Sequence, residues 1–314
     1  MRRGRTRARA RERGRRHTAR VGNAQGNTGT WSFTSAWVVG QLVYERARAW
    51  LSRRGPNGTI LAADRRWGNR LRTAIISDVH ANVDALQTVL ERIAAIGVDR
   101  VVCLGDIVGY NADPAACVDR VREACDTVIA GNHERMLLGR CRDGVARPVL
   151  AAIDWSREQL RAEQLAWLAE LPEEAELEPG ILLVHGSPRD PDEYIARPTV
   201  LRDNYRWLET HRPAVRLCCF GHTHRPLLAA PPRVQRRFGR CEEIELDPAR
   251  LAFVNPGSVG QPRDGSPLAS FAIHDAQRHT ITFVRTPYPI VRAQQRVLAA
   301  GLHERFAQRL AQGR

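Results

Sequence analysis

The 314-residue sequence contains no lysine, and all 48 of its basic residues are arginine. Without lysine there is no Gly-x-x-x-x-Gly-Lys loop, so the phosphate-binding loop of nucleoside triphosphatases is excluded. Complete use of arginine in place of lysine indicates a bias of genome composition more than a functional choice. The number of arginines is therefore not taken as a sign of phosphate recognition.

The sequence also lacks the features of a disulfide scaffold or a membrane protein. Its seven cysteines are an odd number, include no Cys-x-x-Cys pair, and in part lie inside apolar runs such as 217–220. This usage predicts buried thiols in a reducing compartment. The longest apolar stretch near the start, residues 36–43, falls well short of the ~20 residues that a membrane span needs. We therefore expect a cytoplasmic protein without a membrane span.

Charge divides the chain near residue 70. Residues 1–70 hold 17 arginines and only three acidic residues, whereas residues 71–314 hold equal numbers of basic and acidic residues. The arginine-rich residues 1–20 have almost nothing to bury and are predicted to be disordered, and a short helix is possible at 36–54. We expect a basic, largely disordered N-terminal extension, residues 1–70, followed by one domain, residues 71–314.

The extension has two interpretations. It is either an arm that binds nucleic acid or an anionic membrane, or a solvated tail or upstream extension without a role in the native protein. The clean start of the domain at Leu71 favours the second interpretation. Because the domain has no net charge, nucleic acid is a candidate partner only through this arm. The sequence leaves the oligomeric state open.

From residue 71 onward, strands and helices alternate. Strands are predicted at 73–77, 100–104, 127–130, 181–184 and 216–220. Helices are predicted at 83–96, 113–124 and 199–211, and residues 147–170 are predicted to form one or two helices. Beyond residue 225, strands of a second sheet are predicted at 227–230, 241–246, 251–254, 269–274 and 279–285, with a closing helix at 288–300. This order predicts an α/β (α+β) fold, a four-layer αββα sandwich in which two mixed β-sheets lie face to face with helices outside.

Each of the five strands predicted before residue 225 ends in a polar cluster. These clusters are Asp78-Val79-His80, Gly105-Asp106, Gly131-Asn132-His133-Glu134, His185-Gly186 and Gly221-His222-Thr223-His224. Ligands bind at the carboxyl ends of strands in open α/β sheets, so the clusters converge on one rim if their strands share a sheet.

The clustered side chains suit a metal site. Imidazole, carboxylate and carboxamide groups form a mixed nitrogen and oxygen set that fits Mn, Fe, Zn or Ni, whereas Mg or Ca would take nearly all oxygen. No thiol takes part, so a structural Cys-type zinc site is excluded. Seven ligands are too many for one ion and fit two divalent ions that share a bridging carboxylate.

These motifs, in this order, resemble those of the calcineurin-like metallophosphoesterase superfamily. The stretches 78–82, 108–110 and 255–263 are similar to its small bacterial and archaeal single-domain phosphodiesterases. The resemblance spans roughly residues 71–285 and none of residues 1–70.

The resemblance implies a role for each motif residue. It implies that one metal is held by Asp78, His80, His224 and Asp106, and the second by Asn132, His185, His222 and the bridging Asp106. It implies that His133 faces the substrate phosphoryl group without binding metal. Glu134 would orient His133, although many relatives have Asp at this position. The residues Asn82, Tyr110, Ser258 and Arg263 lie in motifs that border the cleft and are candidates for substrate binding, with a plain surface role equally open for Arg263.

The implied activity is hydrolysis of a small-molecule phosphate ester, with a diester expected in preference to a monoester. Two cations, with manganese favoured, clamp the attacking and leaving oxygens, and a metal-bridging hydroxide attacks phosphorus in line. Protonated His133 would assist the leaving group, and no covalent phosphoenzyme is needed. The alternatives are a phosphomonoesterase or protein phosphatase of the same fold, a catalytically idle metal-binding scaffold, and a nuclease recruited by the basic arm.

Overall fold

The structure is a computed structural model that describes residues 71–178 and 180–314. The predicted disorder of residues 1–20, the helix at 36–54 and the division at residue 70 lie outside the described residues or at their edge and stay predictions. Within the described ranges, no helix combines the length and the apolar character needed to cross a membrane.

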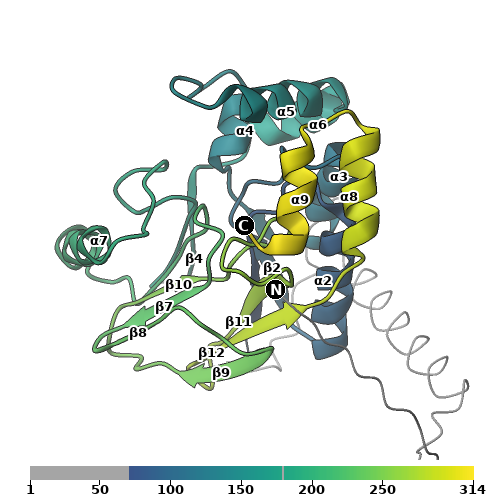
Figure 1. Cartoon of the computed structure of the whole chain (residues 1–314). Coiled ribbons are helices and arrows are strands. Elements are labelled where there is room, and N and C mark those ends of the chain that lie inside the picture. Colours follow the sequence, from purple (N-terminus) through teal and green to yellow (C-terminus); the bar gives the residue numbers. More distant parts are fainter. Residues whose placement is uncertain (1–70, 179) are drawn as a thin grey trace, which may run out of the picture. The chain divides into compact units, whose positions relative to one another are not determined.

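Twelve strands of the described chain form two mixed six-stranded sheets (Figure 1). The first sheet contains, in spatial order, β3 (Thr127–Val128), β2 (Arg100–Cys103), β1 (Arg72–Ile76), β11 (Ala269–Asp275), β12 (Thr280–Thr286) and β9 (Cys241–Glu245). The second sheet contains, in spatial order, β4 (Glu174–Glu178), β5 (Ile181–Val184), β6 (Leu217–Cys219), β10 (Ala252–Asn255), β7 (Leu227–Ala230) and β8 (Arg233–Gln235). In each sheet a parallel set of strands continues into antiparallel ones: β1 pairs parallel with β2 and antiparallel with β11.

The two faces of each sheet bury different cores. In β1, Ala74 and Ile76 pack on the helix side, whereas Ile75 lies between them in sequence and packs between the sheets. The core between the sheets also contains Leu183 of β5 and Phe283 of β12. Successive strand residues point to opposite faces, so strands that are apolar throughout indicate a sheet covered on both sides.

Helices cover the outer faces. The helices are α2 (Val83–Ile96), α3 (Pro114–Ala124), α4 (Asn132–Leu137), α5 (Arg147–Glu158), α6 (Ala162–Ala169), α7 (Pro198–His211), α8 (Ile290–Ala299) and α9 (Glu304–Gln312). Helix α2 contacts β11 and β12 of the first sheet, and α8 packs on α2. Helix α7 packs Leu201 and Leu208 into a core with Leu182 and Phe253 of the second sheet. The predicted αββα sandwich is confirmed.

The assignment of strands to sheets differs from the prediction. The strands after residue 225 were expected to form a second sheet, but β9, β11 and β12 join the first sheet and only β7, β8 and β10 join the second. Hydrophobic periodicity identifies a strand, but it carries no information about which sheet edge is free to pair with it. The sequence analysis also missed β4, β8, α4 and α9.

Candidate metal centre

The five polar clusters meet although their strands belong to two sheets. Asp78 and His80 follow β1 and Asp106 follows β2 of the first sheet, whereas His185 follows β5 and His222 follows β6 of the second. The expectation of a single shared sheet is therefore corrected. The clusters still converge, because the two sheets pack face to face and these strand ends reach the same edge.

The backbone at this edge is unusual. Asp78, His80, Asp106, His222 and His224 all have positive φ angles, between 47° and 64°. Residues other than glycine rarely adopt this left-handed region, and such conformations cluster at functional sites. The fold thus holds five side chains of the site on strained turns just beyond the strand ends.

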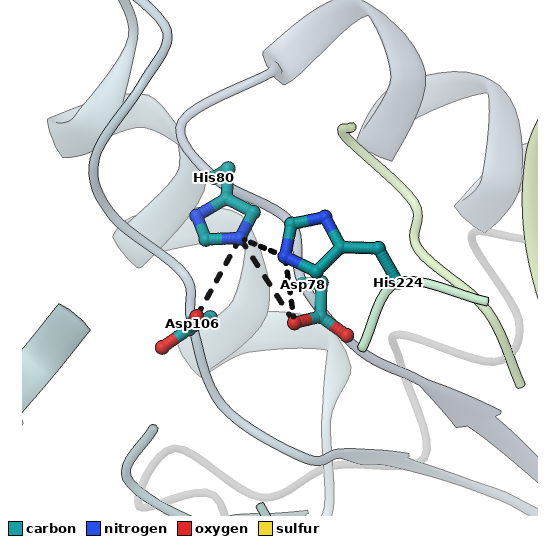
Figure 2. Close-up of side chains that lie close together, drawn as sticks. All are labelled: Asp78, His80, Asp106 and His224. Atoms are coloured by element: carbon teal, nitrogen blue, oxygen red, sulfur yellow. Dashed lines mark hydrogen bonds and ion pairs between the residues drawn. The ribbon is translucent and has the colours of Figure 1, made fainter. Parts of the chain in front are cut away.

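One group of potential ligands consists of Asp78, His80, Asp106 and His224, all buried (Figure 2). The Nε2 atom of His80 lies 3.0 Å from Nε2 of His224 and 3.5 Å from Oδ2 of Asp106. The Nε2 atom of His224 lies 3.4 Å from Oδ1 of Asp78. Four ligand atoms therefore face one another at a distance suited to a shared cation.

Hydrogen bonds fix which ring nitrogens face this space. Nδ1 of His80 lies 3.1 Å from the carbonyl oxygen of Val108, and Nδ1 of His224 lies 2.6 Å from that of Gln261. A carbonyl oxygen only accepts, so both Nδ1 atoms carry the proton and both Nε2 atoms of the neutral rings present lone pairs. Two lone pairs 3.0 Å apart beside two carboxylates are unfavourable without a cation, and this arrangement fits a metal ion.

A second group consists of Asp106, His185 and His222, also buried, with Asn132 beside it. The Nε2 atom of His185 lies 3.4 Å from Oδ2 of Asp106 and 3.1 Å from Oδ1 of Asn132. Nδ1 of His185 donates to the carbonyl of Leu104 at 2.7 Å. Nε2 of His222 donates to the carbonyl of Asp192 at 3.2 Å, which leaves its Nδ1 as the free ligand atom.

Asp106 is common to both groups. Its Oδ1 accepts a hydrogen bond from the backbone N–H of His133 at 2.8 Å, while its Oδ2 faces both His80 and His185. The two carboxylate oxygens thus have separate partners. The two buried His/Asp clusters that share Asp106 suggest a dimetal site.

The charges of the cluster are poorly balanced in the absence of cations. Burial raises the pKa of Asp78 to about 7, although His185 opposes this shift. Burial alone would lower the pKa of His185, but the neighbouring Asp106 outweighs it and raises the value to about 10. Burial lowers the pKa of His80 and of His224 well below the usual range, so both are neutral. A proton on His185 thus occupies the place that a metal ion would take.

Glu134 does not contact His133 in the way that the sequence predicted. Its carboxylate instead accepts four backbone N–H groups at 2.8–3.2 Å, from Asp106, Ile107, Val108 and Gly131. Glu134 thus organises the loop that carries Asp106, and Asp106 in turn accepts from the backbone N–H of His133. An orienting role toward His133 stays a prediction.

His133 is oriented by the same loop. Its Nδ1 lies 3.1 Å from the Val108 carbonyl oxygen, which also accepts from His80. The His133 ring lies 4.5 Å from the His80 ring and 4.6 Å from the Tyr110 ring, centre to centre. At Gly109, an added Cβ would lie only 2.2 Å from Nδ1 of His133, so glycine is required for this close approach. Nε2 is therefore the atom of His133 left to face a ligand.

The four candidates for substrate binding fall into two pairs. Asn82 caps α2 by accepting from Ala85 N at 3.1 Å and donates to Gly260 O at 2.9 Å. Ser258 is fully buried and donates to Asp78 O at 2.8 Å. The structure thus gives these two side chains a role in holding loops, and their expected substrate contact stays a prediction.

Tyr110 and Arg263 border the centre. The guanidinium carbon of Arg263 lies 5.5 Å from the centre of the Tyr110 ring, a cation–π distance. The positive charge of Arg263 is close enough to contribute to the lowered pKa of His224 and of His133, after the larger effect of burial.

Sequence analysis missed two parts of this site. The ring of Tyr194 lies 3.8 Å from the His222 ring, yet the residue is 49% exposed, at the edge of the second cluster. The only sequence signal for Tyr194 is its position, nine residues after the predicted ligand His185. The carbonyl oxygens of Leu104, Val108 and Gln261, which fix four histidine tautomers, have no signature in the side-chain sequence.

Comparison with known proteins agrees with this geometry. The family model of the calcineurin-like phosphoesterase superfamily domain matches residues 71–279. The chain belongs to this superfamily, and it is a metallophosphoesterase with a buried His/Asp cluster for metal.

Individual relatives cover the same part of the chain. An uncharacterized protein of Methanocaldococcus jannaschii is 34% identical over 248 residues, 77% of this chain and 98% of its own length. The crystal structure of a metallophosphoesterase from Sphaerobacter thermophilus is 38% identical, with a TM-score of 0.69, and covers 78% of this chain and 100% of that one. A structure from Pyrococcus horikoshii, 21% identical with a TM-score of 0.64 over 78% of this chain and 99% of that one, has the same fold.

Proposed function

We propose that the chain is a two-metal phosphodiesterase that acts on a small-molecule phosphate ester. The observation that carries this proposal is the position of Asp106, whose Oδ2 lies 3.5 Å from Nε2 of His80 and 3.4 Å from Nε2 of His185. One carboxylate oxygen between two sets of histidines is the arrangement that two adjacent cations require.

The proposed ligands divide between two divalent transition-metal ions, with manganese favoured. The first ion takes Asp78, His80, His224 and Asp106, and the second takes Asn132, His185, His222 and Asp106. When bound, the ions would lower the pKa of water and neutralise charge on the phosphoryl oxygens. The mixed nitrogen and oxygen donors support a transition metal over Mg²⁺ or Ca²⁺.

The protein's own groups orient the ester and balance its charge. His133 has its Nδ1 proton fixed on the Val108 carbonyl, so its Nε2 is the atom that exchanges a proton with the substrate. Burial lowers the pKa of His133, and a phosphoryl anion beside the ring would favour the imidazolium again. Arg263, next to Tyr110, would bind substrate beside the reacting phosphoryl group. Protonated His133 would then assist departure of the leaving alkoxide.

The test combines elemental analysis of the purified protein with turnover of a panel of phosphate monoesters and diesters. We expect about two transition-metal ions per chain and faster hydrolysis of an aryl diester than of the matched monoester. Asp106→Asn should abolish turnover, whereas the control Asp203→Asn, at a partly exposed position on α7, should not.

The other outcomes are informative. A monoester preference would replace the diesterase by a phosphomonoesterase. Two bound metals without turnover of any ester would indicate an idle scaffold. An Asp106→Asn protein as active as the parent would refute the bridging role.

We also propose a cytoplasmic location, because all seven cysteines are free thiols and five of them are buried. Fractionation of the source cells tests this, and recovery from an oxidising compartment would overturn it.

Removing residues 1–70 tests whether the basic N-terminal arm binds nucleic acid. Salt-dependent binding of DNA and RNA that is unchanged by this deletion would remove nucleic acid as a partner.

A further inference from the structure

Helix α9, which the sequence analysis missed, packs against the border of the metal centre. Phe306 in its first turn lies 5.1 Å from Tyr110, ring centre to ring centre, and Tyr110 lies 4.6 Å from His80. At the other end of the helix, the Gly313 carbonyl accepts from Gly265 N at 2.9 Å. An added Cβ at Gly313 would lie 2.5 Å from the carbonyl oxygen of Ser266. Both ends of α9 are thus fixed to segments of the site, and α9 lies beside α8 (Figure 1).

This packing brings Arg309 close to Arg263. Arg309 is one turn beyond Phe306 and is partly buried. The face of α9 that carries Arg309 contacts the Tyr110 ring through Phe306, and the Arg263 guanidinium lies over that same ring. The Gly313 carbonyl, one turn beyond Arg309, accepts from Gly265, two residues after Arg263. The lowered pKa of Arg309, caused first by burial and then by the charge of Arg263, agrees with this placement. Arg305, one turn earlier on α9, is exposed.

Neither Arg263 nor Arg309 has a carboxylate partner among the described residues. The Nη2 of Arg263 donates to the uncharged Oε1 of Gln261 at 2.9 Å, and its buried Nε has no hydrogen-bond partner in that part of the chain. The neighbouring helix differs: Arg292 and Arg296 of α8 pair with Asp84 at 2.6 and 3.5 Å. Two arginines on neighbouring segments without a carboxylate partner, one of them with an unpaired buried donor, are suited to bind an anion.

We propose that Arg263 and Arg309 form a subsite for a second phosphate group of the substrate, distinct from the phosphoester that reacts. This inference rests on the proposed function and names its substrate class: phosphodiesters that carry a further phosphate. The backbone N–H of Arg263 donates to the carbonyl of His224 at 3.2 Å, and its guanidinium lies over the Tyr110 ring, so Arg263 borders the metal centre on the side where α9 packs. Two planar guanidinium groups offer paired donors, which suit the oxygens of a phosphate dianion.

The test uses two compounds that share one scissile diester. One is thymidine 5′-(p-nitrophenyl phosphate), and the other bears an additional 3′-phosphate. We expect the parent protein, loaded with Mn²⁺, to have a KM about tenfold lower for the compound with the second phosphate. Arg309→Gln should remove most of this preference and leave kcat for the simple diester within about twofold. Arg305→Gln, the same change one turn away at an exposed position, should keep the preference.

A binding measurement separates this inference from the proposed activity. Calorimetric titration with thymidine 3′,5′-bisphosphate and with thymidine 5′-monophosphate needs no turnover. Tighter binding of the bisphosphate by about tenfold, lost in Arg309→Gln and kept in Arg305→Gln, supports the subsite even if no ester is hydrolysed. Equal affinities in the parent, or a preference that survives Arg309→Gln, would overturn the subsite, while hydrolysis of the simple diester would leave the proposed function intact.

Discussion

The Nε2 atoms of His80 and His224 lie 3.0 Å apart, while each ring donates its Nδ1 proton to a backbone carbonyl. The two lone pairs repel each other unless a cation lies beside them. The metal ion is therefore expected to stabilise the fold as well as to support catalysis.

His224→Asn tests this relationship. The Asn amide can still donate to the Gln261 carbonyl but has no counterpart of Nε2. We expect the metal-free variant to be at least as stable as the metal-free parent, with a smaller rise in Tm when Mn²⁺ is added. Thermal unfolding with and without metal measures this, with the exposed His211→Asn on α7 as the control. A full metal-dependent rise in His224→Asn would contradict the assignment.

Glu134→Gln should destabilise the domain. The carboxylate accepts four backbone N–H groups, and an amide can accept at only one of its two ends. Loss of about two hydrogen bonds to a buried charged group predicts a loss of roughly 3 kcal/mol in the free energy of unfolding. Urea denaturation of Glu134→Gln and of Glu173→Gln, at an exposed position, provides the comparison. Equal midpoints for both variants would show that the loop does not depend on the Glu134 carboxylate.

Gly109→Ala should displace His133 without removing a metal ligand. A Cβ at this position would lie 2.2 Å from Nδ1 of His133. Gly139 has a similar positive φ, 83° against 87°, and nothing within 4 Å of an added Cβ, so Gly139→Ala matches the backbone strain. We expect kcat to fall at least about tenfold in Gly109→Ala only, with metal content unchanged in both. Equal kcat values for the two variants would remove His133 from the mechanism.

Metal affinity should rise with pH. The pKa of His185 is raised to about 10 in the metal-free protein, chiefly because the attraction of Asp106 overcomes the effect of burial. Below that pH a metal ion must displace the His185 proton, so its affinity should increase about tenfold per pH unit between pH 7.5 and 9. Competition of Zn²⁺ with a chelating dye across this range measures the slope. An affinity independent of pH would show that His185 is not protonated before metal binds.

Much of the fold follows from local sequence pattern. The strand at Ile181–Val184 was predicted with its observed ends and the helix at Pro114–Ala124 to within one residue, because short apolar runs and a Pro at the helix start are local signals. The sheet in which each strand lies was not predictable, since the pairing of Ala74 with Ile273 joins residues far apart in sequence. Helix α9 was not predicted, although Phe306, Ala307 and Leu310 have the spacing of an apolar helix face and are all buried.

The candidate site was predictable in part for the same reason. The ligands could be predicted because His80, Asp106 and His185 each follow a strand that hydrophobic periodicity identifies. The hydrogen-bond partners of Glu134 could not be predicted, because its carboxylate accepts from backbone N–H groups, which almost every residue has. The proximity of Arg309 to Arg263 depends on how α9 docks, which no local pattern encodes.

The most direct measurement is anomalous X-ray diffraction from crystals of the protein grown with Mn²⁺. The account predicts two anomalous peaks about 3.5–4 Å apart, one on each side of Asp106 Oδ2, with His80 and His224 at one and His185 and His222 at the other. A single peak, or two peaks that do not share Asp106, would contradict the two-metal centre.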